Sequence, residues 1–416
     1  MNPLGLIRSP RAALWAVLAL ALTLRVAACC WWQSRMAPGQ QFEFGDSDAY
    51  WVLASHIAHG EPYEYGSADV RIFRMPGYPA LLAPLLWIFG DSMPVVYARL
   101  LSSLFGTAAV AAVYWLATTL FDRRTGLLAA LAAAIYPGAI AMSVIVLSEA
   151  PFCPLYLAQL GAWVKSWVGN ARPRAWALAS GVLGGLATLV RPDWLLFVPF
   201  AALVGLSCTA QHRRHILSSA VMLLGVVMVL APWWWRNWVQ VHEFVPTTLQ
   251  VGASLYDGLN PEATGGSDMR FLAKFVEQER QRGMADRAFE SRLDRRQFEA
   301  AREWAAAHPG RVIELAAIKF VRMWNIWPND ALNGGTLVRL VTVAAFLPAI
   351  VLALAGIWIT RRQPWPVALC WLPAVYLTLL HLIFVSSIRY REPPMLGLLV
   401  FTAVALARGA RPSPAQ

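Results

Sequence analysis

Two carboxylates near the start of the chain are its best candidates for a catalytic base. Asp46 and Asp48 lie in Gly45–Tyr50, directly after the first long apolar segment. The chain is 58% hydrophobic and 14% charged, and a carboxylate beside a membrane is costly unless it is solvated, paired or used in chemistry. A carboxylate can deprotonate or orient a weakly acidic hydroxyl or amine. The ordinary alternative is that an Asp caps the helix that follows.

Further acidic and basic residues lie between the later apolar segments and complete a candidate set. They are Arg74, Glu149, Arg191, Arg236 and Arg389. Arginine stabilises a phosphate or diphosphate leaving group through paired, charge-assisted hydrogen bonds. In a dehydrated site such fixed charge is worth on the order of a hundredfold or more in rate. Together with an Asp base, the set indicates transfer of a group from a lipid phosphate, for which no carboxylic acid need protonate the leaving group.

Each of these residues also has a simpler interpretation. Glu149 precedes Ala150–Pro151 and could begin a helix, where the helix dipole favours an acid. Arg389 and Arg391 could pair with lipid headgroups. His56 and His59 share a helical spacing, but without further ligands at defined spacing they do not predict a metal site. No metal and no other cofactor is therefore expected.

Long apolar segments predict the elements that position these residues. Lipid leaves no backbone polar group unsatisfied, so repeated apolar windows of about 20 residues mean spanning helices. About ten are predicted, at 12–32, 95–121, 127–147, 150–168, 175–192, 194–210, 215–235, 336–360, 366–387 and 394–408. Tyr78–Phe89 is too short to span comfortably and predicts a juxtamembrane or re-entrant helix, or part of a tilted span. The chain is therefore predicted to be an all-α integral membrane protein.

The placement of basic residues predicts its orientation. With the N-terminus in the cytoplasm, every inner loop and the C-terminal tail carry positive charge, as the positive-inside rule requires. These residues are Arg123, Arg124, Lys165, Arg172, Arg174, Arg213, Arg214, Arg361, Arg362, Arg408 and Arg411. The net charge of +11 is thus accounted for by topology, and no basic stretch forms a nucleic-acid groove. Both termini are expected in the cytoplasm.

The same topology places the two long polar stretches, 33–77 and 236–335, outside. In the second, Phe271–Ala307 has apolar residues at helical spacing among Arg, Glu and Gln, which predicts amphipathic helix. Three regions follow: a catalytic transmembrane module at 1–235, an external loop region at 236–335, and C-terminal transmembrane helices at 336–416.

In the order and topology of its motifs, the sequence resembles the glycosyltransferase C superfamily. It most resembles the branch of dolichyl-phosphate-mannose-protein mannosyltransferases and bacterial lipid A aminoarabinose transferases. The resemblance covers most of the chain and rests on Asp46 with Tyr50, Ala54–Gly60, Arg74–Pro79, Ser148–Pro151, Arg191–Pro192, Pro232–Trp233, Arg236–Asn237 and Val245–Pro246.

The resemblance implies a role for each matching residue. The family's catalytic Asp lies four residues before the Tyr, so Asp46 is implied as the base and Asp48 as the alternate. Glu149 matches a second acid that helps to position acceptor or base. Arg74 matches a basic residue that contacts the donor phosphate, and Arg191 and Arg236 are weaker candidates for that contact. Tyr50, Tyr78 and Arg389 are further candidates for substrate contacts.

The function implied is inverting transfer of a hexose or pentose from a polyprenyl-phosphate donor, without a catalytic metal, at the external face of a bacterial inner membrane. The partners are then the lipid-linked donor, membrane lipids and an acceptor. A large C-terminal soluble domain like that of this branch is not expected here, so lipid, glycan and protein acceptors all stay open. The alternative is a transporter or lipid flippase. Transporters often place polar sites near the midplane on broken helices, whereas here the ionisable residues are predicted to concentrate in loops at one membrane face, which disfavours that alternative.

Overall fold

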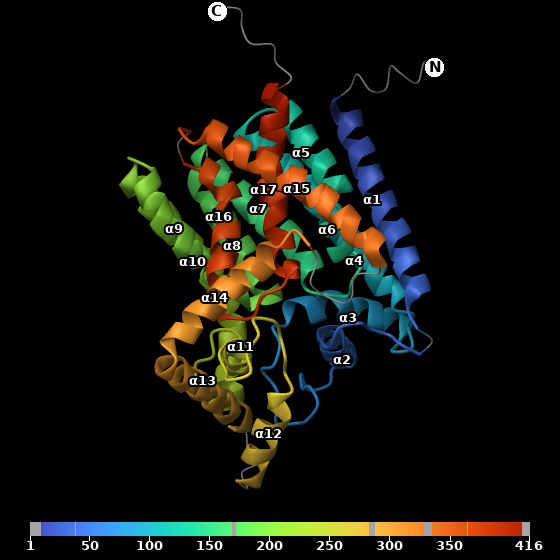
Figure 1. Cartoon of the computed structure of the whole chain (residues 1–416), viewed down its shortest axis with the longest axis vertical. Helices are drawn as coiled ribbons and strands as arrows, with labels where there is room; N and C mark the ends of the chain where they lie inside the picture. The colour runs from blue at the N-terminus through green and yellow to red at the C-terminus, as the bar shows by residue number, and fades with distance from the viewer. Residues whose placement is uncertain are drawn as a thin grey trace, which may run out of the picture.

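The computed structural model describes residues 10–37, 39–168, 172–282, 288–327, 335–363 and 365–409. Within these ranges the regular structure is helical, and β-pairing is limited to an isolated bridge between Tyr65 and Ser67. A helix lies over each of the ten predicted spans. The predicted all-α, multi-pass membrane fold is confirmed, and Figure 1 shows the bundle. Arg411, one of the basic residues of the C-terminal tail, falls outside the described residues.

Four helices of the described part are long and apolar enough to cross a membrane by themselves. They belong to α1 (Pro10–Arg35), α4 (Val96–Leu120), α10 (His212–Val241) and α15 (Gly335–Thr360). At 1.5 Å per residue, a helix of 25 residues such as α4 spans the roughly 30 Å of a hydrocarbon core. Large apolar side chains are exposed along α10 and α15, among them Leu224, Met228, Val351 and Leu354, as suits a surface against lipid.

Shorter helices fill the space between these four. They are α5 (Arg123–Ile135), α6 (Pro137–Met142), α7 (Glu149–Trp167), α8 (Pro173–Val190), α9 (Phe197–Cys208), α16 (Leu372–Ile383) and α17 (Glu392–Gly409). Small residues allow close packing of backbones where lipid surrounds a bundle. A side chain on Gly181 of α8 would lie 2.0 Å from the Met222 carbonyl oxygen of α10. This contact therefore requires a glycine.

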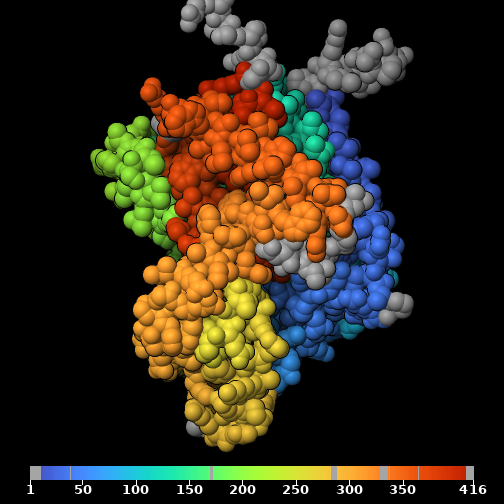
Figure 2. All heavy atoms as spheres, in the orientation of Figure 1, coloured from blue at the N-terminus to red at the C-terminus, as the bar shows by residue number. Residues whose placement is uncertain are grey.

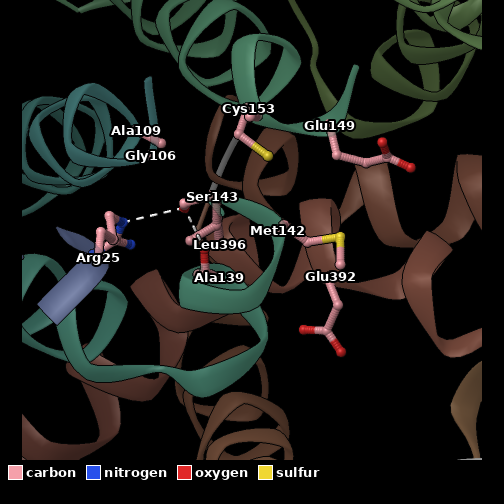
Figure 3. A pocket seen from close by; sticks show the side chains of 11 residues that line it. Arg25, Gly106, Ala109, Ala139, Met142, Ser143, Glu149, Cys153, Glu392 and Leu396 are labelled. Carbon is pink, nitrogen blue, oxygen red and sulfur yellow. Dashed lines mark hydrogen bonds between the residues drawn. The ribbon is translucent and has the colours of Figure 1, made fainter. Parts of the chain in front are cut away.

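The span predicted over 127–147 is not one continuous helix. Pro137 disfavours helical geometry at the residue before it, and Tyr136 is extended between α5 and α6. Arg25 of α1 is buried at the break and donates to the Ala134 and Ala133 carbonyl oxygens (3.2 and 3.3 Å) and to Ser143 Oγ (3.2 Å). Figure 3 shows the Arg25–Ser143 contact beside Glu392 and Cys153. Arg25 thus satisfies carbonyl groups that the break leaves without helical partners.

The remaining helices form the end of the molecule that carries the polar stretches. α2 (Gly45–His59), α3 (Gly77–Phe89), α11 (Val251–Gly258), α12 (Phe271–Gln281) and α13 (Phe289–Ala307) lie at the end of the bundle away from both chain termini (Figure 1), and α14 (Pro309–Trp324) leads back toward it. Tyr78–Phe89 lies within α3. Figure 2 shows the yellow and orange surface of 240–282 and 288–324 beside the blue surface of the first polar stretch.

Candidate active site

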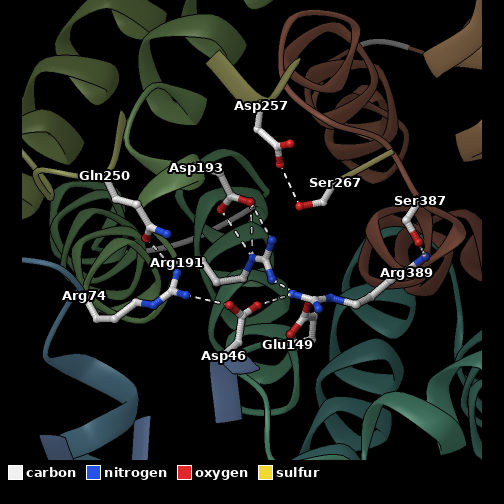
Figure 4. A network of polar contacts seen from close by, with 10 residues as sticks. All are labelled: Asp46, Arg74, Glu149, Arg191, Asp193, Gln250, Asp257, Ser267, Ser387 and Arg389. Atoms are coloured by element: carbon white, nitrogen blue, oxygen red, sulfur yellow. Dashed lines mark hydrogen bonds and ion pairs between the residues drawn. The ribbon is translucent and has the colours of Figure 1, made fainter. Parts of the chain in front are cut away.

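Five separate elements bring candidate residues together at one place, which Figure 4 shows. Asp46 lies in the first turn of α2, Arg74 in the loop before α3, and Glu149 at the first residue of α7. Arg191 directly follows α8, and Arg389 lies in the short 3-10 helix η4 (Ile388–Arg391) before α17. Helix ends and loops, which leave backbone polar groups free, thus supply the whole set.

Asp46 is held between two arginines. Its Oδ1 accepts from Arg74 at 2.5 Å, and its Oδ2 accepts from Arg389 at 3.3 Å. Burial by itself would raise the pKa of the Asp46 carboxyl, but Arg74 and Arg389 more than offset it, so the pKa lies below its ordinary value. The side chain is still 34% exposed. Asp46 is therefore an ionised carboxylate that solvent or substrate can reach.

Glu149 lies behind Asp46 and links two arginines. Its fully buried side chain accepts at Oε1 from Arg389 Nε (2.6 Å) and Arg191 (2.7 Å). Arg191 also pairs with Asp193 at 2.7 Å. Arg389 contacts both Asp46 and Glu149, so it joins the exposed and buried parts of this network.

Aromatic rings hold the arginines on their flat faces. The Arg74 guanidinium lies 4.7 Å from the Phe73 ring and 5.6 Å from the Tyr50 ring. Tyr50 packs edge-on against Tyr78, with centroids 5.0 Å apart. Such contacts fix the plane of a guanidinium while leaving its N–H groups free to bind an anion.

Three of the predicted residues lie outside this network. Asp48 is exposed and accepts from the Tyr65 hydroxyl at 3.1 Å. Arg236 donates to the Arg71 carbonyl oxygen at 2.9 Å and lies 4.8 Å from the Trp233 ring. Tyr78 is fully buried beneath Tyr50, so it supports Tyr50 from below.

The geometry bears on the simpler interpretations of these residues as helix caps, headgroup-binding groups or metal ligands. Phe44 and Ser148 occupy the N-cap positions of α2 and α7, so Asp46, Asp48 and Glu149 lie inside the first turns of these helices. Arg391 is fully buried and donates to the backbone of Met323 and Asn325, so it is enclosed by protein. His56 and His59 lie near Glu61 and Asp91 (3.6 and 4.0 Å), and no group of three metal-binding side chains occurs among the described residues.

Two members of the network were missed by the sequence analysis. Asp193 lies two residues after Arg191, and that spacing was a signal that could have been used. Gln250 comes from the long polar stretch 236–335 and accepts from Arg74 at 2.8 Å. No local pattern singles out Gln250, since its partner is 176 residues away.

Charges in the network balance. The acids Asp46, Glu149 and Asp193 each pair with at least one of Arg74, Arg191 and Arg389, giving three negative and three positive groups in this part of the described chain. Buried charges are tolerated when they are paired and hydrogen-bonded. An anion that binds here must therefore compete with these carboxylates for the arginines.

Solved structures share this architecture. The oligosaccharyltransferase of Archaeoglobus fulgidus in its apo form aligns with a TM-score of 0.60 and 17% identity over 95% of this chain and 50% of that chain. The chain has the glycosyltransferase C fold. A second structure of that glycosyltransferase C enzyme, in complex with an inhibitory peptide and a dolichol-phosphate, aligns with a TM-score of 0.55 and 16% identity over the same shares. The chain spans about half the length of these relatives.

Two further comparisons concern sequence and a bacterial structure. The family model for dolichyl-phosphate-mannose-protein mannosyltransferase matches residues 74–235, a range that begins at Arg74 and includes Glu149 and Arg191. ArnT from Cupriavidus metallidurans bound to undecaprenyl phosphate aligns with a TM-score of 0.48 and 16% identity over 95% of this chain and 78% of that chain. No curated protein sequence matches the chain significantly. The family-model match and the Archaeoglobus fulgidus structures confirm the predicted resemblance at the level of the fold.

Proposed function

We propose that this chain is an inverting glycosyltransferase that moves a hexose or pentose from a polyprenyl-phosphate donor to a lipid, glycan or protein acceptor. The observation that carries the proposal is the position of Asp46, a reachable carboxylate held directly between Arg74 and Arg389. A base flanked by two phosphate-binding groups is the arrangement that displacement at a sugar phosphate needs. The dolichol-phosphate held by the Archaeoglobus fulgidus relative supports a lipid phosphate as the donor.

In the proposed reaction the acceptor attacks the anomeric carbon from the side opposite the phosphate. Asp46 takes the proton from the acceptor hydroxyl or amine. The bond between the anomeric carbon and the phosphate oxygen breaks, and the electron pair leaves with the polyprenyl phosphate. Arg74 and Arg389 stabilise the charge that grows on this leaving group, while Glu149 and Arg191 hold Arg389 in place.

Binding of the donor would also activate the base. Asp46 is a weak base while both arginines contact it, because they lower its pKa. A phosphate that draws Arg74 and Arg389 toward itself leaves the carboxylate with less positive charge around it, which raises the pKa of Asp46 toward the range useful for proton transfer. Proton abstraction is thus coupled to the presence of donor.

The site is proposed to face the outside of a bacterial inner membrane. Helices α5 and α10 begin, and α15 ends, at the end of the bundle opposite α2 and α3 (Figure 1), and these helix ends carry Arg123, Arg213 and Arg361. By the positive-inside rule, this distribution of basic residues supports a cytoplasmic position for that side.

Asp46→Asn tests the base assignment. The amide keeps the size of the side chain and can still accept from an arginine, but it cannot take a proton. We expect loss of transfer from polyprenyl-phosphate donors by the purified variant, with its thermal unfolding and donor binding retained. Asp48→Asn is the matched control and is expected to retain activity. Full activity of Asp46→Asn would refute the assignment.

A further inference from the structure

Helix α13 carries two acids whose hydrogen bonds the proposed reaction does not use directly. Glu290 is only 3% exposed, and its Oε2 accepts from the backbone N–H groups of Arg71 (2.8 Å) and Ile72 (2.9 Å). Asp294, one turn further along α13, accepts from the backbone N–H of Gly252 at 2.6 Å. Both acids therefore bind main chain that belongs to other parts of the molecule.

The segments held by these acids are the ones that carry Arg74 and Gln250. Arg71 and Ile72 lie just before Arg74, and Gly252 lies just after Gln250. Arg74 donates to Gln250 at 2.8 Å. The two segments are also joined directly, because the N–H of Leu249 donates to the Ile72 carbonyl oxygen at 3.0 Å.

The segments 71–74 and 249–252, together with Glu290 and Asp294 of α13, form a junction. Close packing makes this junction stiff. A side chain on Gly252 would lie 1.9 Å from the Asp294 carbonyl oxygen, so α11 approaches the backbone of α13 as closely as a glycine permits. Asp294 also caps the first turn of α11, where N–H groups have no helical partner. A shift of α13 would be passed to Gln250 and to Arg74.

We propose that Glu290 and Asp294 are positioning residues that hold Arg74 and Gln250 in the geometry that receives the donor phosphate. This inference rests on the proposed function for its effect on catalysis, and on the hydrogen bonds alone for its effect on structure. Misplacing a phosphate-binding group by about 1 Å can cost on the order of a hundredfold in rate. We therefore expect the loss of these acids to weaken donor binding and to leave acceptor binding unchanged.

The junction also gives donor binding a defined dependence on pH. Burial raises the pKa of Glu290 to about 7, against the opposing effects of the Ile72 and Arg71 N–H groups and of Arg236, while Asp294 adds to the rise. Burial raises the pKa of Asp294 to about 6, against the Gly252 N–H. An acid whose pKa is raised by folding stabilises the fold fully below its unfolded pKa and loses that contribution as pH rises through the folded value. The junction is thus weakest above about pH 7.

The test compares three variants: Glu290→Ala, Glu290→Gln and Glu279→Ala. Alanine leaves two buried N–H groups without an acceptor, whereas glutamine keeps the acceptor and stays neutral at every pH. Glu279 is the matched control: it is buried and pairs with Arg292 and Arg296 of α13 at 2.8 Å, but it contacts neither segment of the junction. Its loss destabilises the same helix without releasing Arg74.

The readouts are donor KM, acceptor KM and kcat between pH 5.5 and 8.5, with amide hydrogen exchange at Ile72 and Gly252. We expect Glu290→Ala to raise the donor KM at least tenfold with acceptor KM unchanged, and to speed exchange at Ile72. Glu290→Gln should restore both and remove the rise of donor KM above pH 7. Glu279→Ala should leave donor KM within twofold of the unmodified protein.

Two outcomes would overturn the inference. Equal kinetic losses in Glu290→Ala and Glu279→Ala would mean that the acids act only through general stability. Unchanged exchange at Ile72 in Glu290→Ala would mean that the anchor does not hold the segment. Hydrogen exchange needs no turnover, so failure of the proposed function is recognised separately, as an unmodified protein that neither binds undecaprenyl phosphate nor transfers sugar.

Discussion

At the scale of single residues, Arg389 is the residue on which the site depends most. Its guanidinium contacts Asp46 on one side and Glu149 on the other, so it connects the reachable carboxylate to the buried one. Only a planar group with several N–H donors can make both contacts at once, and lysine presents a single compact charge instead. Its geometry should therefore matter as much as its charge.

Arg389→Lys should lower kcat/KM on the order of a hundredfold, because one ammonium cannot hold Asp46 and Glu149 while binding a phosphate. Initial rates at saturating acceptor measure this loss. Arg295→Lys is the control, since Arg295 forms an exposed pair with Glu243 at 3.0 Å. A variant within threefold of the unmodified protein would show that charge alone suffices at position 389.

The sequence separates Asp46 from Asp48 better than it finds their partners. Two residues apart on a helix, the two acids point to different faces, and the Asp46–Tyr50 spacing favoured the one that lies in the network. Arg74, Glu149 and Arg191 were predicted from their places beside apolar segments. Gln250 and the pairing of each acid with its arginine could not be predicted, because they depend on contacts between distant loops.

At the scale of elements, the contact between the start of α3 and the end of α8 sets the distance between Arg74 and Arg191. A side chain on Gly77, the first residue of α3, would lie 2.5 Å from the Leu189 carbonyl oxygen, and Arg191 follows two residues later. The position therefore needs a glycine because two backbones approach closely. Arg74 and Arg191 are held on the two sides of this contact.

Gly77→Ala should push α3 away from the end of α8 and impair both folding and transfer. Overpacking of this kind costs about 1–3 kcal/mol, measurable as a lower thermal unfolding midpoint together with reduced transfer. Gly45→Ala is the matched control, since nothing lies within 4 Å of the side chain that it would add at the start of α2. Equal behaviour of the two variants would contradict the proposed role of this contact.

Element boundaries were predicted less well than element existence. Apolar length predicted helix in each of the ten segments, although only four of the described helices are long and apolar enough to cross a membrane by themselves. It did not find the break between α5 and α6, where Pro137 and the buried Arg25 replace a continuous hydrogen-bond ladder. Nor did it assign Arg25 a role, since a charge inside an apolar segment gives no sign of which carbonyl groups it will contact.

At the scale of the whole molecule, the polar network and the short basic loops lie at opposite ends of one helical bundle. The network lies at the ends of α7 and α8 that are away from Lys165 and Arg174. Helices α11 to α13 lie at the same end as the network (Figure 1). This polarity indicates a protein built to act at one surface of a membrane.

Thiol labelling tests the orientation. In a background without the five native cysteines, Glu61→Cys places a thiol in the first polar stretch and Arg213→Cys places one at the start of α10. Both native side chains are exposed. A membrane-impermeant maleimide should label position 61 in intact spheroplasts and position 213 only after lysis. The reverse pattern would place the site in the cytoplasm.

The contact between Asp46 and Arg389 joins residues that are 343 positions apart. During synthesis, Asp46 and Arg74 leave the ribosome long before the segment that carries Gln250, and Arg389 follows later still. A growing chain therefore holds the proposed base Asp46 and Arg74 without Arg389, which links Asp46 to Glu149. Under the proposed function, the site is complete only after the segment that carries Arg389 has been inserted, so an unfinished chain in the membrane is expected to leave the proposed lipid-linked donor unused.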